Sequence, residues 1–386
     1  MSCAFEGGLA LAQLERGSTM LHQTRRRFLS LCSACVLVSW PSLLGPIAFA
    51  ERVPDLRDVP YGPYSRNLLD VYLADSQTPT PILIFFHGGG FVAGDKGSVK
   101  EDLLSQCLQA GITVVSSNYR FILGPESAPF PAPMMDGARA VQFVRSKAKE
   151  WNLDPDRVAL AGGSAGACMS IWLGVHDDLA DPSAQDKVSR ISTRIQCVIG
   201  YGGQTTLDPA QILKHIGGNP AIHPSLRPFY GVRTQEELQS REKQDLIKEA
   251  TALNHVDAGD PPMQLRYRGT LQDVPLAPDA RTNHSIHHPM FGKLLKDAYE
   301  PLGLLCELVC DDFPEKRSEI QFLKHCFEMK EAFSEPEPET NAAFGCGPFL
   351  CQYSAGRGSD DWQHARRCRN LRLSFPKPHL PPPRVE

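Results

Sequence analysis

Hydrophobic and polar positions in the middle of the chain follow two different periods. Residues 67–73 (NLLDVYL) alternate like a half-buried strand, whereas residues 81–86 (PILIFF) form a continuous apolar run, as in a buried parallel strand. Comparable short runs predict further strands at 112–116, 157–161, 195–199, 263–267 and 305–309. The pattern therefore predicts at least seven strands in one region of the chain.

The segments between these strands have apolar residues at the spacing of a helix. Residues 136–151 carry apolar or small residues three to four positions apart, with Asp136 expected as the N-cap. Further helices are expected at 165–174, 291–302 and 320–327. Alternating strands and helices predict an α/β fold with a mostly parallel sheet covered on both faces. Residues 207–256 are polar and mostly helical, and they are interpreted as an inserted cap.

The first 50 residues have the pattern of an export signal. Arg25 and Arg26 precede the apolar run 29–47, which ends in an A-x-A site at Ala48-Phe49-Ala50. The paired arginines resemble a twin-arginine signal, so the mature chain is expected to start near Glu51 and to be periplasmic or extracellular. The alternative is a membrane anchor. Because serine, glycine and proline interrupt the run, a cleaved signal is favoured, and no stable membrane span is expected in the mature chain.

Residues 331–386 differ in composition from the preceding region. They are rich in proline, glycine and arginine and show no sustained period. Such a segment cannot bury enough apolar surface to offset its ordering entropy, so we expect a disordered tail after a hydrolase-like domain at 51–330.

Composition excludes several classes of protein. The 386 residues include 40 basic and 44 acidic side chains, and this balance argues against nucleic-acid binding. No C-x-x-C pair or zinc-finger spacing occurs, so no metal site is expected. The twelve cysteines allow disulfides after export, but the sequence does not assign their pairing.

One loop that follows a predicted strand has the pattern of a nucleophilic serine. Residues 162–166 read GGSAG between the strand RVALA and a helical stretch. This G-x-S-x-G pattern is typical of a nucleophile elbow, in which small residues allow a sharp turn that exposes the serine oxygen. Ser164 is therefore the candidate nucleophile, and a serine in a structural turn is the alternative.

A second loop, residues 87–91 (HGGGF), follows the strand PILIFF. Glycines let backbone N–H groups approach the negative charge that develops on an attacked carbonyl oxygen. The expected donors are the amides of Gly89, Gly90 and Ala165. The same cluster does not complete a phosphate loop, because Asp95 intervenes before Lys96, so no nucleotide cofactor is expected.

Together, HGGGF and GGSAG resemble the α/β-hydrolase superfamily, specifically its hormone-sensitive-lipase-like and feruloyl-esterase-like carboxylesterases. Residues 118–120 (NYR) and 153–158 (LDPDRV) also look like that family. The resemblance, over about residues 67–327, implies an eight-stranded sheet, a cap over the site, and a Ser–Asp–His triad. It further implies no metal or organic cofactor and a small-molecule ester as substrate.

By the family's order, the acid follows the strand MQLRY. The turn there reads GTLQDVP, so Asp273 is the expected acid and Asp279 the next candidate. Asp260 precedes the strand and is expected at the wrong end of the sheet. A turn-capping role for Asp273 is the alternative.

The histidine position departs from the family pattern. The loop after the last strand reads DDFPEKR and contains no histidine. The candidates are therefore His284, His287 and His288, with His288 favoured over His287 because Pro289 would fix the chain as it enters the next helix. His325, near the end of the final helix, is the remaining alternative.

Two functions follow from these residues. One is an exported serine esterase in which Ser164 attacks the ester, a histidine acts as the base and Asp273 orients it. The other is a binding protein of hydrolase fold that lacks a competent base. The intact glycine loops favour the first, and the missing family histidine favours the second.

Overall fold

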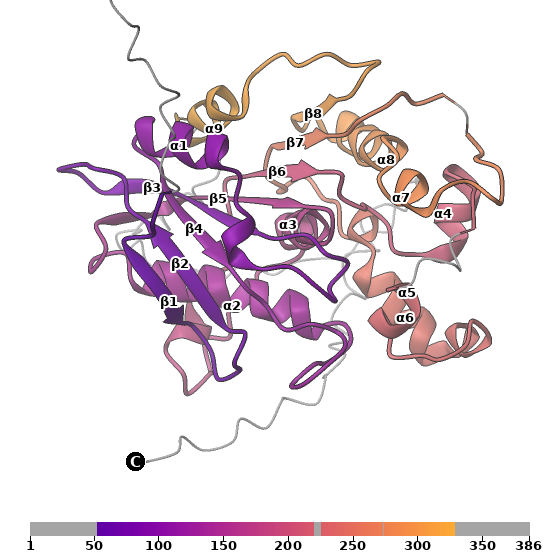
Figure 1. Ribbon diagram of the computed structural model, residues 1–386, viewed down its shortest axis with the longest axis horizontal. Helices are drawn as coiled ribbons and strands as arrows, with labels where there is room; N and C mark the ends of the chain where they lie inside the picture. Colours follow the sequence, from indigo (N-terminus) through magenta and orange to yellow (C-terminus); the bar gives the residue numbers. More distant parts are fainter. Residues whose placement is uncertain (1–51, 220–224, 273, 329–386) are drawn as a thin grey trace, which may run out of the picture. The chain divides into compact units, whose positions relative to one another are not determined.

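The computed structural model describes residues 52–219, 225–272 and 274–328 (Figure 1). The expected export signal, the expected tail and Asp273 lie outside these residues. Within them, no helix combines the length and apolar character needed to cross a bilayer.

One eight-stranded sheet forms the centre of the described chain, in the order β1-β2-β4-β3-β5-β6-β7-β8. Strand β1 pairs antiparallel with β2, and β2 pairs antiparallel with β4. All pairs among β3, β4, β5, β6, β7 and β8 are parallel. The strands are β1 (Leu56–Pro60), β2 (Leu68–Tyr72), β3 (Thr80–Phe86), β4 (Thr113–Ser117), β5 (Leu153–Gly163), β6 (Cys197–Tyr201), β7 (Met263–Arg266) and β8 (Cys306–Val309).

The seven strands expected from the hydrophobic pattern are all present. The eighth, β1, escaped that pattern because it lies at the sheet edge and none of its residues is fully buried. An edge strand needs no continuous apolar run, since one of its sides faces solvent.

Helices cover both faces of the sheet. Leu83 and Phe85 of β3 pack with α1 and α9 on one face, whereas Ile84 and Phe86 pack with α2 and α3 on the other. The α-helices are α1 (Glu101–Gln109), α2 (Ala132–Ser146), α3 (Ala165–Val175), α4 (Pro209–His215), α5 (Leu226–Phe229), α6 (Arg241–Ala250), α7 (Thr282–Ile286), α8 (Met290–Tyr299) and α9 (Glu319–Glu328). Short 3₁₀ helices are η1 (Lys96–Ser98), η2 (Val188–Arg190), η4 (Glu236–Gln239), η5 (Ala252–Asn254) and η6 (Glu300–Leu302).

Asp136 is not the N-cap of its helix, contrary to the expectation from sequence. Helix α2 begins at Ala132, so Asp136 lies inside the helix and is buried. Its carboxylate accepts hydrogen bonds from Asn67 at 3.0 Å and pairs with Arg120 at 2.7 Å. A buried ion pair thus explains an acidic residue that the local pattern assigned to a helix start.

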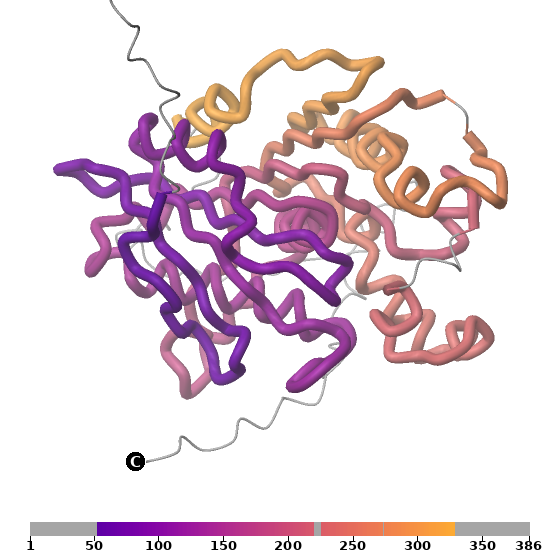
Figure 2. The backbone as a smooth tube through the Cα atoms, viewed as in Figure 1, coloured from indigo at the N-terminus to yellow at the C-terminus, as the bar shows by residue number. Residues whose placement is uncertain are grey.

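The segment 207–256 contains α4, α5 and α6, and its backbone path can be followed in Figure 2 by the colour of the tube. Several contacts join it to the sheet-bearing part of the chain. Gly217 forms a β-bridge with Leu276, and the Phe130 amide donates to the Phe229 carbonyl at 2.8 Å. The indole of Trp172 in α3 donates to the Glu249 carbonyl at 2.9 Å. These contacts hold the helical segment beside the carboxyl ends of the parallel strands and beside α3.

Candidate active site

Ser164 occupies the sharp turn between β5 and α3. Its backbone has φ 50° and ψ −114°, a strained conformation for a residue with a side chain. A Cβ on Gly162 would lie 2.3 Å from the Gly166 carbonyl carbon, and one on Gly166 would lie 2.0 Å from the Phe86 carbonyl oxygen. The glycines of GGSAG are thus required for close backbone contact, and the expected strand–turn–helix geometry is present.

The glycine loop after β3 runs beside Ser164. A Cβ on Gly88 would lie 3.5 Å from Ser164 Cβ, so the two loops are in contact. Gly89 and Gly90 have φ of 113° and 60°, which few other residues adopt without strain. Gly90 and Ala165 line the pocket with Ser164. Ala165 also opens α3, so its amide is one of those without an intrahelical acceptor.

Gly90 and Ala165 thus lie beside Ser164 at one pocket, and the donor role expected of their amides stays a prediction. The Gly89 carbonyl accepts hydrogen bonds from the amides of Val92 and Ala93 at 3.0 and 3.1 Å. That turn fixes the path of the glycine run.

His87 stabilises the glycine loop through hydrogen bonds. It is fully buried, stacked on Tyr119 with ring centroids 4.3 Å apart, and burial lowers its pKa to about 4. The neutral ring donates from Nδ1 to the Gly88 carbonyl at 2.7 Å and accepts at Nε2 from Arg66 at 3.2 Å. Arg66 also donates to the Gly94 carbonyl at 3.1 Å. Sequence reasoning missed Arg66, because it lies in a turn before β2 without a motif.

His287 is the histidine that contacts the serine. Its Nε2 lies 2.8 Å from Ser164 Oγ, and its Nδ1 lies 3.0 Å from the Asn283 carbonyl oxygen. A carbonyl can only accept, so Nδ1 carries the proton and Nε2 has a lone pair for the serine hydroxyl. Burial lowers the pKa of His287, opposed by the hydrogen bond to Asn283. A neutral, correctly oriented imidazole is the form that a general base requires.

His288, the favoured candidate from sequence, does not occupy this place. It is buried under the start of α8, where its Nδ1 accepts the Met290 amide at 3.1 Å. Because α7 ends at Ile286, adjacent side chains after it project differently, and only His287 turns toward Ser164. His284 is exposed, and His325 lies in α9, which packs near α1.

The acid expected in the triad is not among the described side chains around His287. Asp273 lies outside the described residues, so its role stays a prediction. Asp279 is exposed, and Asp260 is buried before β7 at the opposite end of the strands from Ser164, as expected. In the described chain, the Asn283 carbonyl takes the orienting position that a carboxylate holds in a triad.

Two residues after β6 position His287, and no motif had singled them out. Gly202, with φ 62°, lies against the imidazole, so that an added Cβ would be 3.2 Å from His287 Cδ2. Gln204 donates to the Ile286 carbonyl, which holds the end of α7. The signal that could have identified them is the sequence Tyr201-Gly202-Gly203-Gln204, a glycine-containing turn directly after a predicted strand.

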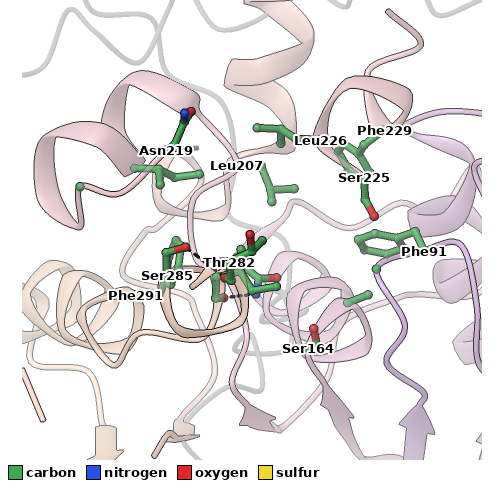
Figure 3. A pocket seen from close by; sticks show the side chains of 16 residues that line it. Phe91, Ser164, Leu207, Asn219, Ser225, Leu226, Phe229, Thr282, Ser285 and Phe291 are labelled. Atoms are coloured by element: carbon green, nitrogen blue, oxygen red, sulfur yellow. Dashed lines mark hydrogen bonds between the residues drawn. The ribbon is translucent and has the colours of Figure 1, made fainter. Parts of the chain in front are cut away.

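A pocket opens in front of Ser164 (Figure 3). Ser164 and Phe91 come from the sheet-bearing part of the chain, and Leu207, Leu226 and Phe229 come from the helical segment 207–256. Polar groups are few and neutral, among them Asn219, Ser225, Thr282 and Ser285. No charged side chain lines this pocket among the described residues. The pocket thus suits an uncharged, largely apolar group next to the serine.

The chain is similar to known proteins over most of its described length. The model of the BD-FAE family matches residues 69–276. Esterase LipQ of Mycobacterium tuberculosis is 26% identical over 268 residues, covering 68% of this chain and 57% of that protein. A probable isoprenylcysteine alpha-carbonyl methylesterase of Arabidopsis thaliana, ICMEL1, is 29% identical over 227 residues, covering 58% of this chain and 45% of that protein. The chain spans about half the length of these curated relatives.

Solved structures show the same fold. A truncated carbohydrate esterase from gut microbiota aligns with a TM-score of 0.52 at 20% identity, covering 71% of this chain and 95% of that chain. The bifunctional GH43-CE of Bacteroides eggerthii aligns with a TM-score of 0.54 at 18% identity, covering 72% of this chain and 38% of that chain. The expected α/β-hydrolase fold is therefore confirmed.

Proposed function

The chain belongs to the BD-FAE family, and we propose that it is a serine hydrolase that cleaves carboxylic esters through an acyl-enzyme intermediate. The observation that carries the proposal is the 2.8 Å contact between His287 Nε2 and Ser164 Oγ. The strained elbow and the adjacent glycine loop support it, because they are the other parts that such a reaction needs. The esterase names of the matching relatives agree with it.

The chemistry follows from the positions of these groups. His287 Nε2 takes the hydroxyl proton as Ser164 Oγ attacks the carbonyl carbon of the ester. The negative charge on the carbonyl oxygen faces the amides of Gly90 and Ala165, with Gly89 as a further candidate donor. The C–O bond to the alcohol then breaks, and the alcohol leaves with the proton from His287. Water repeats the sequence on the acyl-serine, which releases the acid and restores the hydroxyl.

The substrate proposed is a small uncharged ester. A carboxylate or ammonium group in the pocket would lose its hydration without a charged partner, because the lining there is neutral. The apolar groups of Phe91, Leu207 and Phe229 would instead gain from covering an acyl or alcohol carbon chain.

An activated-serine probe tests the proposal. Full-length protein should label with a fluorophosphonate, and Ser164→Ala should not. His287→Ala should reduce hydrolysis of a short activated ester on the order of 10⁴-fold, since nucleophile and base act as a unit. Asp273→Asn should reduce it severely if that residue is the acid. His284→Ala is the matched control, because this exposed histidine lies three residues from His287 and should leave the rate unchanged.

The second candidate, a binding protein without a competent base, has one observation in its favour. The orienting partner of His287 in the described chain is a main-chain carbonyl, which does not neutralise the imidazolium formed during catalysis. Failure of folded wild-type protein to label would overturn the esterase proposal and leave this one.

Export through the twin-arginine route is proposed as well. It rests on Arg25 and Arg26 before the apolar run and on the A-x-A site. Replacing both arginines by lysine should leave unprocessed precursor in the cytoplasm, as followed by fractionation and immunoblotting. Unimpaired export of the double variant would contradict this route.

A further inference from the structure

A cluster of two histidines and a glutamate lies at the opposite end of α3 from Ser164. His176 is the C-cap of α3, Glu249 lies in the last turn of α6, and His255 follows η5. One nitrogen of each histidine and one carboxylate oxygen all lie within 4.8 Å of one another. The cluster joins the helical segment 207–256 to the helix that begins at the candidate nucleophile.

The imidazole of His176 lies between two hydrogen-bond acceptors. Its Nδ1 lies 2.9 Å from the Asp177 carbonyl oxygen, and its Nε2 lies 2.9 Å from Glu249 Oε1. Both neighbours accept hydrogen bonds, but a neutral imidazole has only one N–H. A neutral imidazole can therefore donate to only one of these two oxygens.

One hydrogen bond fixes the tautomer of His255. Its Nε2 lies 2.7 Å from the Glu249 main-chain oxygen, which places the proton on Nε2 and leaves the lone pair on Nδ1. A histidine whose other N–H donates to a carbonyl is the usual arrangement around a protein-bound metal ion.

The surrounding charges favour a cation. The carboxyl end of α3 carries the negative end of the helix dipole. Asp177 follows His176 directly, and its charge acts on His255. The opposing group is Arg194, which lies 3.7 Å from Asp177 and donates to the His176 carbonyl at 3.4 Å. Arg194 is thus engaged by groups at the edge of the cluster.

We propose that His176, Glu249 and His255 bind a divalent transition-metal ion, with Zn²⁺ preferred over Mg²⁺ and Ca²⁺. Two imidazoles and one carboxylate suit Zn²⁺, whereas Mg²⁺ and Ca²⁺ take oxygen ligands. Ligands at ~2.1 Å in a tetrahedron lie about 3.4 Å apart. The His176–Glu249 pair, at 2.9 Å, must open by about 0.5 Å, and the other ligand pairs, all within 4.8 Å, must close by at most about 1.4 Å. The side chains of His176 and Glu249 are 14% and 28% exposed, which leaves water access for a fourth ligand.

The ion would stabilise structure rather than take part in ester cleavage. Ser164 and His176 flank the 11 residues of α3, so this cluster lies roughly 18 Å from Ser164 along the helix. Its ligands come from α3 and from the segment that supplies Leu207, Leu226 and Phe229 to the pocket. Metal binding would therefore fix that segment against the nucleophile helix.

Calorimetric titration of metal-free full-length protein with Zn²⁺ tests this site. We expect one ion per chain, bound more tightly than Mg²⁺ or Ca²⁺, and at least tenfold weaker binding in Glu249→Gln and in His255→Gln. Glu249→Gln keeps a hydrogen-bond acceptor for His176, and circular dichroism shows whether each variant folds. The matched control is His325→Gln, in α9. At 100 times the dissociation constant, Zn²⁺ should raise the Tm of wild type by ~5 °C and leave that of Glu249→Gln unchanged.

Other results would overturn the proposal. These are no saturable Zn²⁺ binding by folded wild type, or equal binding by wild type and both ligand variants. A thiolate-to-cobalt charge-transfer band on Co²⁺ substitution would show that cysteines bind the metal instead. A doubly protonated His176 ring in NMR spectra, together with no Zn²⁺ binding, would show that a proton fills the place.

Discussion

Gly202→Ala should separate the positioning of His287 from the stability of the fold. Gly202 has φ 62°, and an added Cβ would lie 3.2 Å from His287 Cδ2 and 3.7 Å from its Cβ and Cγ. The ring must therefore yield by a few tenths of an ångström. That shift acts directly on the 2.8 Å contact between His287 Nε2 and Ser164 Oγ.

The expected effect has two parts. The left-handed backbone costs an alanine about 1–2 kcal/mol, which lowers Tm by roughly 2–8 °C in a domain of this size. Displacement of the base lowers kcat by about 10- to 100-fold with little change in KM, because misplacing a catalytic group by ~1 Å costs about 10²-fold. Thermal unfolding and hydrolysis of a short activated ester measure the two parts.

Gly303→Ala is the matched control. Gly303 has φ 70°, similar to Gly202, but nothing lies within 4 Å of an added Cβ. It should lose similar stability and keep full activity. If the two variants lose the same stability and both keep the wild-type kcat, the contact between Gly202 and His287 does not position a catalytic base, and the reasoning fails.

Two further predictions concern titration. Burial lowers the pKa of His287 below the ordinary 6.5. Because protonation of His287 removes the base, kcat/KM should fall only at pH values below 6.5. A decrease in kcat/KM that begins above pH 6.5 would instead indicate a carboxylate paired with the imidazole. Burial raises the pKa of Asp260 to about 7 from an ordinary 3.8. The folded state then binds a proton that the unfolded state releases, so this residue should lower the free energy of unfolding as pH rises from about 4 to about 7. Asp260→Asn should remove that decrease, as measured by urea unfolding across this range, whereas an unchanged pH dependence would show that Asp260 is ionised in the folded protein.

Short-range features of this protein were readable from the sequence. The central strands β3 and β5 contain continuous apolar runs, because strands buried on both faces need apolar side chains at nearly every position. The turns around Ser164 and Gly89 were readable as well. Close backbone approach and positive φ both require glycine at particular positions within a short stretch, and the sequence shows whether glycine is there. The edge strand β1 was missed because its exposure removes that constraint.

Which distant residues meet was decided by the tertiary structure. Ser164 and His287 are 123 positions apart, and the choice between His287 and His288 depends on where α7 ends and on the space left by Gly202. Asp136 had the local pattern of a helix cap but is buried in an ion pair with Arg120. His176 and Glu249, 73 positions apart, belong to no motif. A hydrogen bond or a metal ligand set needs distances fixed to a few tenths of an ångström, and only the packing of the whole chain supplies them.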